Sequence, residues 1–139
     1  MRKDGYINPI TECLSKIYVK DGIDIFNYLI TEENFITYHH VIKCEDLKGL
    51  EFSKEKTIEN GVALSHFGHG YFHYIEEFAP DIYFHINKIL LLLAKERRIP
   101  TNEERNLLQI LFEAFEYRME GYRKIPDHFL VRERKLVIS

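Results

Sequence analysis

The chain has 139 residues, of which 45% are hydrophobic and 29% charged, values typical of one folded domain rather than a disordered protein. The net charge of −3 excludes a strongly basic coat for nucleic acid, so contact with phosphate requires a local patch or a metal ion. Two cysteines, Cys13 and Cys44, are too few for a disulfide framework and favour a reducing, cytoplasmic compartment. The longest apolar run, residues 89–94, is too short for a membrane span, and no signal-peptide pattern starts the sequence.

Two helices are predicted before residue 34. Asn8 followed by Pro9 is typical of a helix start, and apolar residues then recur at helical spacing until Asp21-Gly22 ends the run. A second, short helix is indicated by the same spacing in Ile25, Phe26, Leu29 and Ile30. An isoleucine-rich segment also suits a strand, so this alternative stays open.

The middle of the chain has a different pattern. Residues 35–42 are β-branched and aromatic, which predicts a strand, and the polar residues 43–56, with Gly49 among them, predict a loop. A second short strand is predicted from Gly61 to Leu64, and residues 66–77 return to helical spacing.

The last third is predicted to be a helical hairpin. One helix follows Pro80-Asp81 and ends before Pro100, and the next begins with Thr101 and Glu104 in the spacing of a capping box. That second helix should end near Gly121, and its expected buried stripe consists of Leu107, Leu108, Leu111, Phe112 and Phe115. The sequence thus predicts an α+β fold in one mostly helical domain spanning 1–139.

Five of the seven histidines fall within 35 residues: His39, His40, His66, His69 and His73. His69 and His73 are four positions apart on a predicted helix, so both rings can reach one metal ion. The doublet His39-His40 can supply a third ligand and a separate base, because neighbouring strand residues face opposite ways. A helical histidine pair alone is more often a solvated or stacked pair than a metal site, but the order doublet, loop, strand, helical pair favours a metal site.

The residues Tyr38-His39-His40-Val41-Ile42, followed by Asn60, His69 and His73, resemble the motif of the HNH endonucleases, the ββα-metal finger. The spacing of nine residues from Asn60 to His69 and four to His73 is similar to that of the colicin-type nucleases of this family. The resemblance covers residues 35–78, and it implies an HNH core embedded between flanking helices at 1–34 and 80–125. It also implies an origin common in this family, a phage or mobile element.

The resemblance further implies a role for each motif residue. His39, His69 and His73 would hold one divalent metal ion, with Zn, Mg, Mn and Ni all open as its identity. His40 would be the general base that takes a proton from water. Asn60, the other residue of the catalytic set, would hold that base in place by bonding backbone across the loop. The expected activity is hydrolysis of DNA phosphodiester bonds to a 5′-phosphate and a 3′-hydroxyl, with RNA open as a substrate.

The sequence departs from the commoner family pattern in its loop, where Lys43 stands near the usual proline and Gly49 is a single glycine. Two alternatives to a nuclease remain. One is a catalytically inactive nucleic-acid-binding module, and the other is a structural zinc protein whose fourth ligand is Cys44 or Glu76. The oligomeric state is open.

Weaker candidates lie around the motif. His66 starts the helix of the finger and is interpreted as a solvent-exposed residue, while Glu76 and Glu77 either orient a ligand imidazole or form a polar helix face. His85 and His128 are interpreted as structural or surface residues. Residues 126–139 form a basic tail whose Arg132, Arg134 and Lys135 either follow a phosphate backbone or are a solvated chain end.

Overall fold

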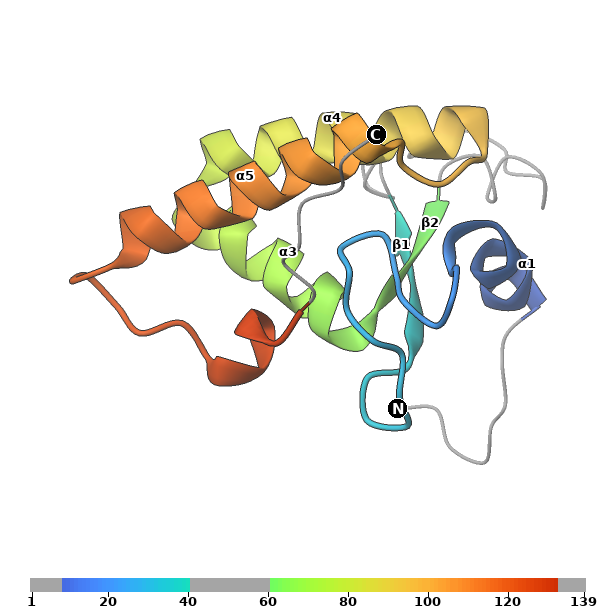
Figure 1. Cartoon of the computed structure of the whole chain (residues 1–139), viewed down its shortest axis with the longest axis horizontal. Helices are drawn as coiled ribbons and strands as arrows, with labels where there is room; N and C mark the ends of the chain where they lie inside the picture. The colour runs from blue at the N-terminus through green and yellow to red at the C-terminus, as the bar shows by residue number, and fades with distance from the viewer. Residues whose placement is uncertain (1–8, 41–60, 133–139) are drawn as a thin grey trace, which may run out of the picture.

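The computed structural model describes residues 9–40 and 61–132. Within these ranges the elements are α1 (Pro9–Tyr18), β1 (Ile36–His40), β2 (Gly61–Ser65), α3 (His66–Phe78), α4 (Pro80–Glu96), α5 (Asn102–Met119) and the 3-10 turn η2 (Asp127–Leu130). The described part is therefore a small domain with four α-helices and a two-stranded antiparallel sheet, compatible with the predicted α+β class (Figure 1). Nine residues named above lie outside it: Asn8, Val41, Ile42, Lys43, Cys44, Gly49, Asn60, Arg134 and Lys135.

The two strands pair antiparallel and lie between two helices. Thr37 is opposite Leu64, and His39 is opposite Val62. Because side chains alternate along a strand, Thr37 and His39 share one face of the ribbon. Helix α3 follows β2 directly and packs on the strands, while α1 lies on their other side (Figure 1). Both predicted strands and the helix after them are confirmed within the described residues.

Helix α3 has a well-defined start. Ser65, the last residue of β2, is its N-cap, and the Ser65 hydroxyl accepts a hydrogen bond from the backbone N–H of Gly68 at 3.0 Å. This bond satisfies one of the N–H groups that a helix start leaves unpaired. The strand therefore passes into the helix without an intervening loop, which fixes the direction in which α3 leaves the sheet.

The short helix predicted around residues 25–30 is wrong. The segment is a turn with isolated bridges, and Asn27 has a left-handed backbone with φ of 70°. The carboxylate of Asp24 accepts hydrogen bonds from the N–H groups of Phe26 and Tyr28, which holds the backbone in the turn. Ile25, Phe26 and Tyr28 are buried in this non-helical arrangement, so the apolar spacing reflects core packing rather than a helix.

Helices α4 and α5 form the predicted antiparallel hairpin along one edge of the molecule (Figure 1). Arg118 near the end of α5 makes two hydrogen bonds to Asp81 at the start of α4. Tyr18 of α1 donates a hydrogen bond to the carbonyl of Leu93, which ties α1 to α4. The helices and the sheet enclose one core, and its largest fully buried side chains are Tyr18, Tyr28, Tyr71, Phe72, Phe112, Phe115, Leu14, Ile25, Leu64, Ile75, Ile86 and Leu90.

The predicted capping box of α5 is present and is reinforced from outside the helix. The Thr101 hydroxyl accepts from the N–H of Glu104, and the Glu104 carboxylate accepts from the N–H of Thr101. The same carboxylate accepts two hydrogen bonds from the guanidinium of Arg98, at 2.7 and 3.0 Å. The contact with Arg98 lowers the pKa of Glu104 to about 2.

Replacing this carboxylate tests its contribution to stability. We expect Glu104→Gln to lower the free energy of unfolding at neutral pH by about 1–2 kcal/mol, because it weakens the capping box and the charged bonds to Arg98. A carboxylate whose pKa is lowered on folding stabilises the fold above its unfolded pKa and loses that effect as the pH falls toward its folded pKa. The difference between wild type and variant should therefore shrink as the pH falls from 4.5 to about 2.

Urea denaturation at several pH values measures this difference. The neighbouring Glu103→Gln is the matched control, since Glu103 is exposed in the same helical turn. A difference that stays constant across the acid range contradicts the electrostatic part of the explanation.

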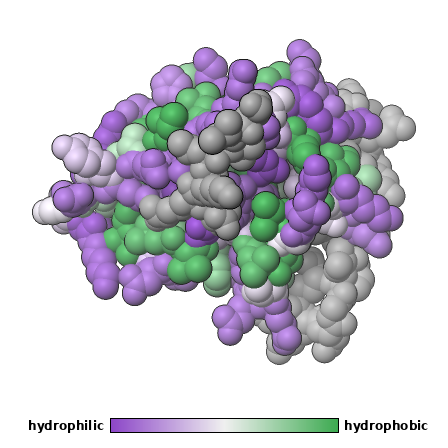
Figure 2. Space-filling view, viewed as in Figure 1, coloured by the Kyte–Doolittle hydropathy of each residue, from purple (hydrophilic) through white to green (hydrophobic). Residues whose placement is uncertain are grey.

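Large apolar side chains are exposed mainly on the helical hairpin. They include Phe84 and Leu91 on α4 and Leu107 and Ile110 on α5, so the prediction that Leu107 is buried is wrong. Of the two consecutive leucines, Leu107 is exposed and Leu108 is buried. Figure 2 shows apolar side chains between hydrophilic ones on the face that it presents. In the described ranges, no helix combines the length and apolar character that a membrane crossing requires.

Candidate metal centre

Three of the predicted metal ligands come together where β1 meets α3. His39 lies on the strand face that carries Thr37, and His69 and His73 lie one helical turn apart on α3. One ring nitrogen from each histidine lies within 4.8 Å of the other two. The ring centroid of His39 lies 5.1 Å from that of His69 and 5.7 Å from that of His73. The three side chains are therefore close enough to hold one metal ion.

The cluster is buried on one side and open on the other. His39 is only 3% exposed, and its ring packs edge-on against Phe72 with centroids 4.9 Å apart. His69 is half-buried and His73 is exposed. An ion held by these residues would rest on a rigid ligand from the sheet and would face solvent on the His73 side, where water or a substrate can approach.

The donor set suits a divalent ion. Three imidazoles suit Zn²⁺, Ni²⁺ and similar ions, and they leave coordination positions for other ligands. Neutral imidazoles do not cancel the charge of the ion, so an anionic oxygen, such as one of a phosphate, is a favourable further ligand. Among the described residues the group of possible ligands consists of these three histidines.

Two of the three ligands have hydrogen-bond partners at the ring nitrogen nearer the backbone. His69 Nδ1 lies 2.8 Å from the hydroxyl oxygen of Thr37, which itself lies 2.8 Å from the carbonyl oxygen of Leu64. His73 Nδ1 lies 3.0 Å from a carboxylate oxygen of Glu76. The prediction that Glu76 orients a ligand imidazole is thus supported by a direct contact, while Glu77 is exposed.

Thr37 is a site residue that the sequence analysis missed. The signal was present, because Thr37 precedes His39 by two positions and residues two apart share a strand face. A threonine in a strand is usually explained by its β propensity, so only the position of His69 gives its hydroxyl a role.

The two predicted catalytic residues are less fully described than the metal ligands. His40 is the last residue of β1, and its backbone is opposite Gly61. The structure does not describe its side chain. Asn60 precedes β2 directly and is outside the described ranges. Their roles therefore remain predictions, although the backbone places His40 next to the ligand His39.

The remaining histidines lie away from the cluster. His66 is exposed at the start of α3, as predicted, and its ring stacks on Phe35 with centroids 4.8 Å apart. His128 packs against Phe67 and Phe129, and His85 is exposed on α4. None of these three belongs to the group that can hold an ion.

Of the three tail residues predicted to follow a phosphate backbone, Arg132 lies within the described residues, and Arg134 and Lys135 lie outside them. The side chain of Arg132 is only 1% exposed, pairs with Glu116 at 2.8 Å and packs over the ring of Phe112. Burial thus overturns the prediction that Arg132 contacts a nucleic-acid backbone. Arg118 is paired with Asp81, and Arg123 packs over Phe78. The predicted tail contributes a core contact through Arg132 instead.

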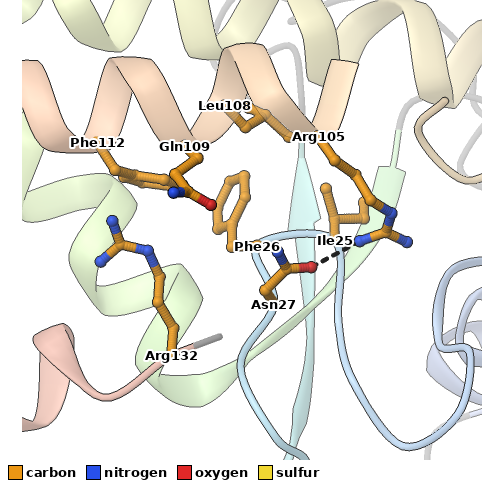
Figure 3. A pocket seen from close by; sticks show the side chains of 8 residues that line it. All are labelled: Ile25, Phe26, Asn27, Arg105, Leu108, Gln109, Phe112 and Arg132. Carbon is orange, nitrogen blue, oxygen red and sulfur yellow. Dashed lines mark hydrogen bonds between the residues drawn. The ribbon is translucent and has the colours of Figure 1, made fainter. Parts of the chain in front are cut away.

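A small recess lies between α5 and the turn at residues 25–27 (Figure 3). It has a volume of about 200 Å³, part of it open to solvent. Arg105 and Arg132 line its two ends, and Arg105 donates a hydrogen bond to Asn27 at 2.7 Å. Phe26 lies between the two guanidinium groups in Figure 3, and Phe112 lies beside that of Arg132, so these groups do not converge on one point. The recess contains none of the three metal-ligand candidates.

Comparison with known proteins adds no independent evidence for a family. No protein-family model, no curated protein and no solved structure matches this chain significantly.

Proposed function

We propose that the chain is a metal-dependent endonuclease of the HNH type, with DNA as its substrate. The observation that carries the proposal is the convergence of His39, His69 and His73 at the contact between β1 and α3. These three residues are the ones that the resemblance assigned as metal ligands. Their elements occur in the order strand, strand, helix, as a ββα-metal finger requires.

The proposed mechanism assigns separate tasks to the residues of the motif. His39, His69 and His73 would hold a divalent ion, which would supply Lewis-acid stabilisation of charge on the phosphate oxygens. His40 accepts a proton of the attacking water as the water oxygen bonds to phosphorus. The bond from phosphorus to the 3′ oxygen then breaks, and this leaving oxygen takes a proton from solvent. With an unperturbed pKa of about 6.5, a histidine base is functional near neutral pH. Asn60 holds the backbone that carries this base. The products are a 5′-phosphate and a 3′-hydroxyl.

The test is nicking of supercoiled plasmid DNA by the purified full chain with Mg²⁺, Mn²⁺, Ni²⁺ or Zn²⁺. We expect cutting that a chelator abolishes. His40→Ala should cut at least about 100-fold more slowly, because general-base catalysis contributes about 10²–10⁴-fold. His69→Ala should lose both metal and cutting. His85→Ala is the matched control, since His85 is exposed on α4 and outside the cluster, and it should cut like wild type.

Other outcomes distinguish the alternatives. Equal cutting by wild type and His40→Ala contradicts the role of His40 as base. Metal loss in His40→Ala, measured by elemental analysis, contradicts it as well, because His40 would then be a ligand. If no metal supports DNA cutting, the same variants are assayed on RNA. Full metal loading without cleavage of either substrate overturns the endonuclease in favour of a structural metal site or an inactive binding module.

A further inference from the structure

The hydroxyl of Thr37 lies between two groups that constrain where its single hydrogen points. One is the backbone carbonyl of Leu64, the residue directly opposite Thr37 in the sheet, and the other is Nδ1 of His69. A carbonyl oxygen can only accept a hydrogen bond, so the hydroxyl hydrogen is donated to Leu64. The oxygen of Thr37 must then accept from His69, and the proton of the neutral imidazole is therefore on Nδ1.

The same reasoning gives the tautomer of the second helical histidine. Nδ1 of His73 faces a carboxylate oxygen of Glu76, and a carboxylate can only accept. The proton of neutral His73 is therefore also on Nδ1. In both rings the lone pair is on Nε2, the nitrogen farther from the backbone and the one with the longer reach toward a shared ion.

We propose that Thr37 and Glu76 are positioning residues that fix His69 and His73 as Nε2 ligands before any metal binds. The inference takes the cluster as a metal centre and so rests on the proposed function. Imidazole ligands that are fixed in tautomer and orientation bind metal more tightly, and the loss of such a partner typically lowers affinity by about 10–100-fold. The two histidines of α3 are thus held by two different partners, His69 by Thr37 from β1 and His73 by Glu76 from the same helix.

The two partners differ in charge and in surroundings. Thr37 is neutral, and it links the carbonyl of Leu64 in β2 through β1 to His69 in α3, so the register of the strands sets the tautomer of a ligand on the helix. Glu76 lies on the same helix as His73, and this pair is near the surface. Its negative charge would also offset part of the charge of a bound ion. Thr37 therefore acts by geometry, and Glu76 acts by geometry and charge.

Substitution of Thr37 tests the geometric part. Thr37→Val keeps the shape and suits a strand but removes the hydroxyl, and Thr37→Ser retains the hydroxyl. We expect Thr37→Val to bind Zn²⁺ about 10–100-fold more weakly than wild type, measured by competition with a chromophoric chelator, and Thr37→Ser to bind within about threefold of wild type. Thermal unfolding of the metal-free variants verifies that both remain folded.

A second readout needs no metal. Long-range ¹H–¹⁵N spectra of the metal-free protein distinguish a protonated ring nitrogen from an unprotonated one. At a pH where the ring is neutral, wild type and Thr37→Ser should show His69 protonated on Nδ1, and Thr37→Val should lose this preference. A merely structural role for Thr37 would leave the tautomer unchanged.

Substitution of Glu76 separates charge from orientation. In Glu76→Gln the amide oxygen still accepts from Nδ1 of His73, so the tautomer should stay while the charge is lost. We expect an affinity for Zn²⁺ that falls about tenfold with an unchanged His73 tautomer. Glu77→Gln removes the same charge from the next residue, which is exposed, and is the matched control expected to bind like wild type.

The outcomes also separate this inference from the proposed function. If wild type binds Zn²⁺ and Thr37→Val binds it equally well, the positioning role of Thr37 is overturned while the metal centre stands. If His69 is protonated on Nε2 in wild type, the tautomer assignment is overturned whatever the affinity. If wild type binds none of Zn²⁺, Ni²⁺, Mn²⁺ and Mg²⁺, the metal centre fails, and the proposed function and the positioning role fail with it.

Discussion

His39→Ala should abolish measurable binding of Zn²⁺ by this chain. His39 is the ligand that the sheet contributes, and without it the site retains two histidines that are four positions apart on α3. Two imidazoles on one helix lack the third donor that fixes an ion in place. Because His39 is buried against Phe72, it is also the ligand whose position is held most firmly by the fold.

The effect can be measured through stability as well as through binding. An ion that binds only the folded state at 100 times its dissociation constant raises the free energy of unfolding by about 2.7 kcal/mol. Wild type should therefore show a Zn²⁺-dependent rise in its unfolding transition, and His39→Ala should show none. Elemental analysis after dialysis gives the metal content of both proteins directly.

His66→Ala is the matched control for this experiment. His66 lies on α3 one turn before His69 but outside the group of ligand candidates. This variant should retain both metal content and the Zn²⁺-dependent stabilisation. If His39→Ala binds Zn²⁺ as tightly as wild type, the ion is held elsewhere and the proposed centre is wrong.

The elements with strong local signals were predictable from the sequence. The strands at 36–40 and 61–65 and the helices of the last third follow from β-branched runs, helical periodicity, Pro80, Pro100 and the capping box at Thr101 and Glu104. The proximity of His39, His69 and His73 was predictable for a related reason. Side chains alternate along a strand, so only one residue of the His39-His40 doublet can face the helix. Residues four positions apart on a helix share a face, so His69 and His73 lie together.

The failures come from contacts between residues distant in sequence. Residues 25–30 have helical spacing, but their turn is held by Asp24, whose second oxygen bonds to the N–H of Ser65. In the sequence Arg132 has the character of a surface cation, but in the structure it pairs with Glu116 and packs over Phe112. Thr37 gains a role only once α3 is packed on the strands. Periodicity and composition contain no information about such pairings, so a single sequence does not predict them.

The carboxylate of Asp24 shows how strongly such a distant contact can support the site. It is fully buried, and it accepts three backbone hydrogen bonds: from Phe26 at 3.0 Å, from Tyr28 at 2.8 Å and from Ser65 at 2.9 Å. Burial raises the pKa of Asp24, and the N–H donors oppose this by stabilising the charged form. Since Ser65 is the N-cap of α3, Asp24 fastens the turn to the start of the helix that carries two ligands.

Gly68 is part of the same arrangement. A Cβ atom at Gly68 would lie 2.7 Å from Oδ2 of Asp24, which is closer than such atoms approach one another. Glycine in the first turn of α3 therefore allows the carboxylate to reach the N–H of Ser65. Any side chain at position 68 would therefore force the Asp24 carboxylate to move and would disturb its hydrogen-bonding pattern.

Asp24→Asn changes that pattern without changing the shape of the side chain. The amide oxygen can replace Oδ1, but an NH₂ group then takes the place of Oδ2 and faces the N–H of Ser65, donor against donor. A buried donor left without an acceptor costs about 1–3 kcal/mol, so we expect a loss of about that size in the free energy of unfolding. Asp24→Ala leaves all three donors unsatisfied, and its loss should be larger.

Urea denaturation of the metal-free protein measures these losses, and Asp21→Asn is the matched control. Asp21 is an exposed residue of the preceding turn with φ of 56°, a backbone conformation that asparagine tolerates well. Its substitution should change the free energy of unfolding by less than about 0.5 kcal/mol. If Asp24→Asn is as stable as the control, the three bonds to Asp24 do not hold the start of α3. The preorganisation of His69 and His73 must then depend on the packing of α3 against the strands alone.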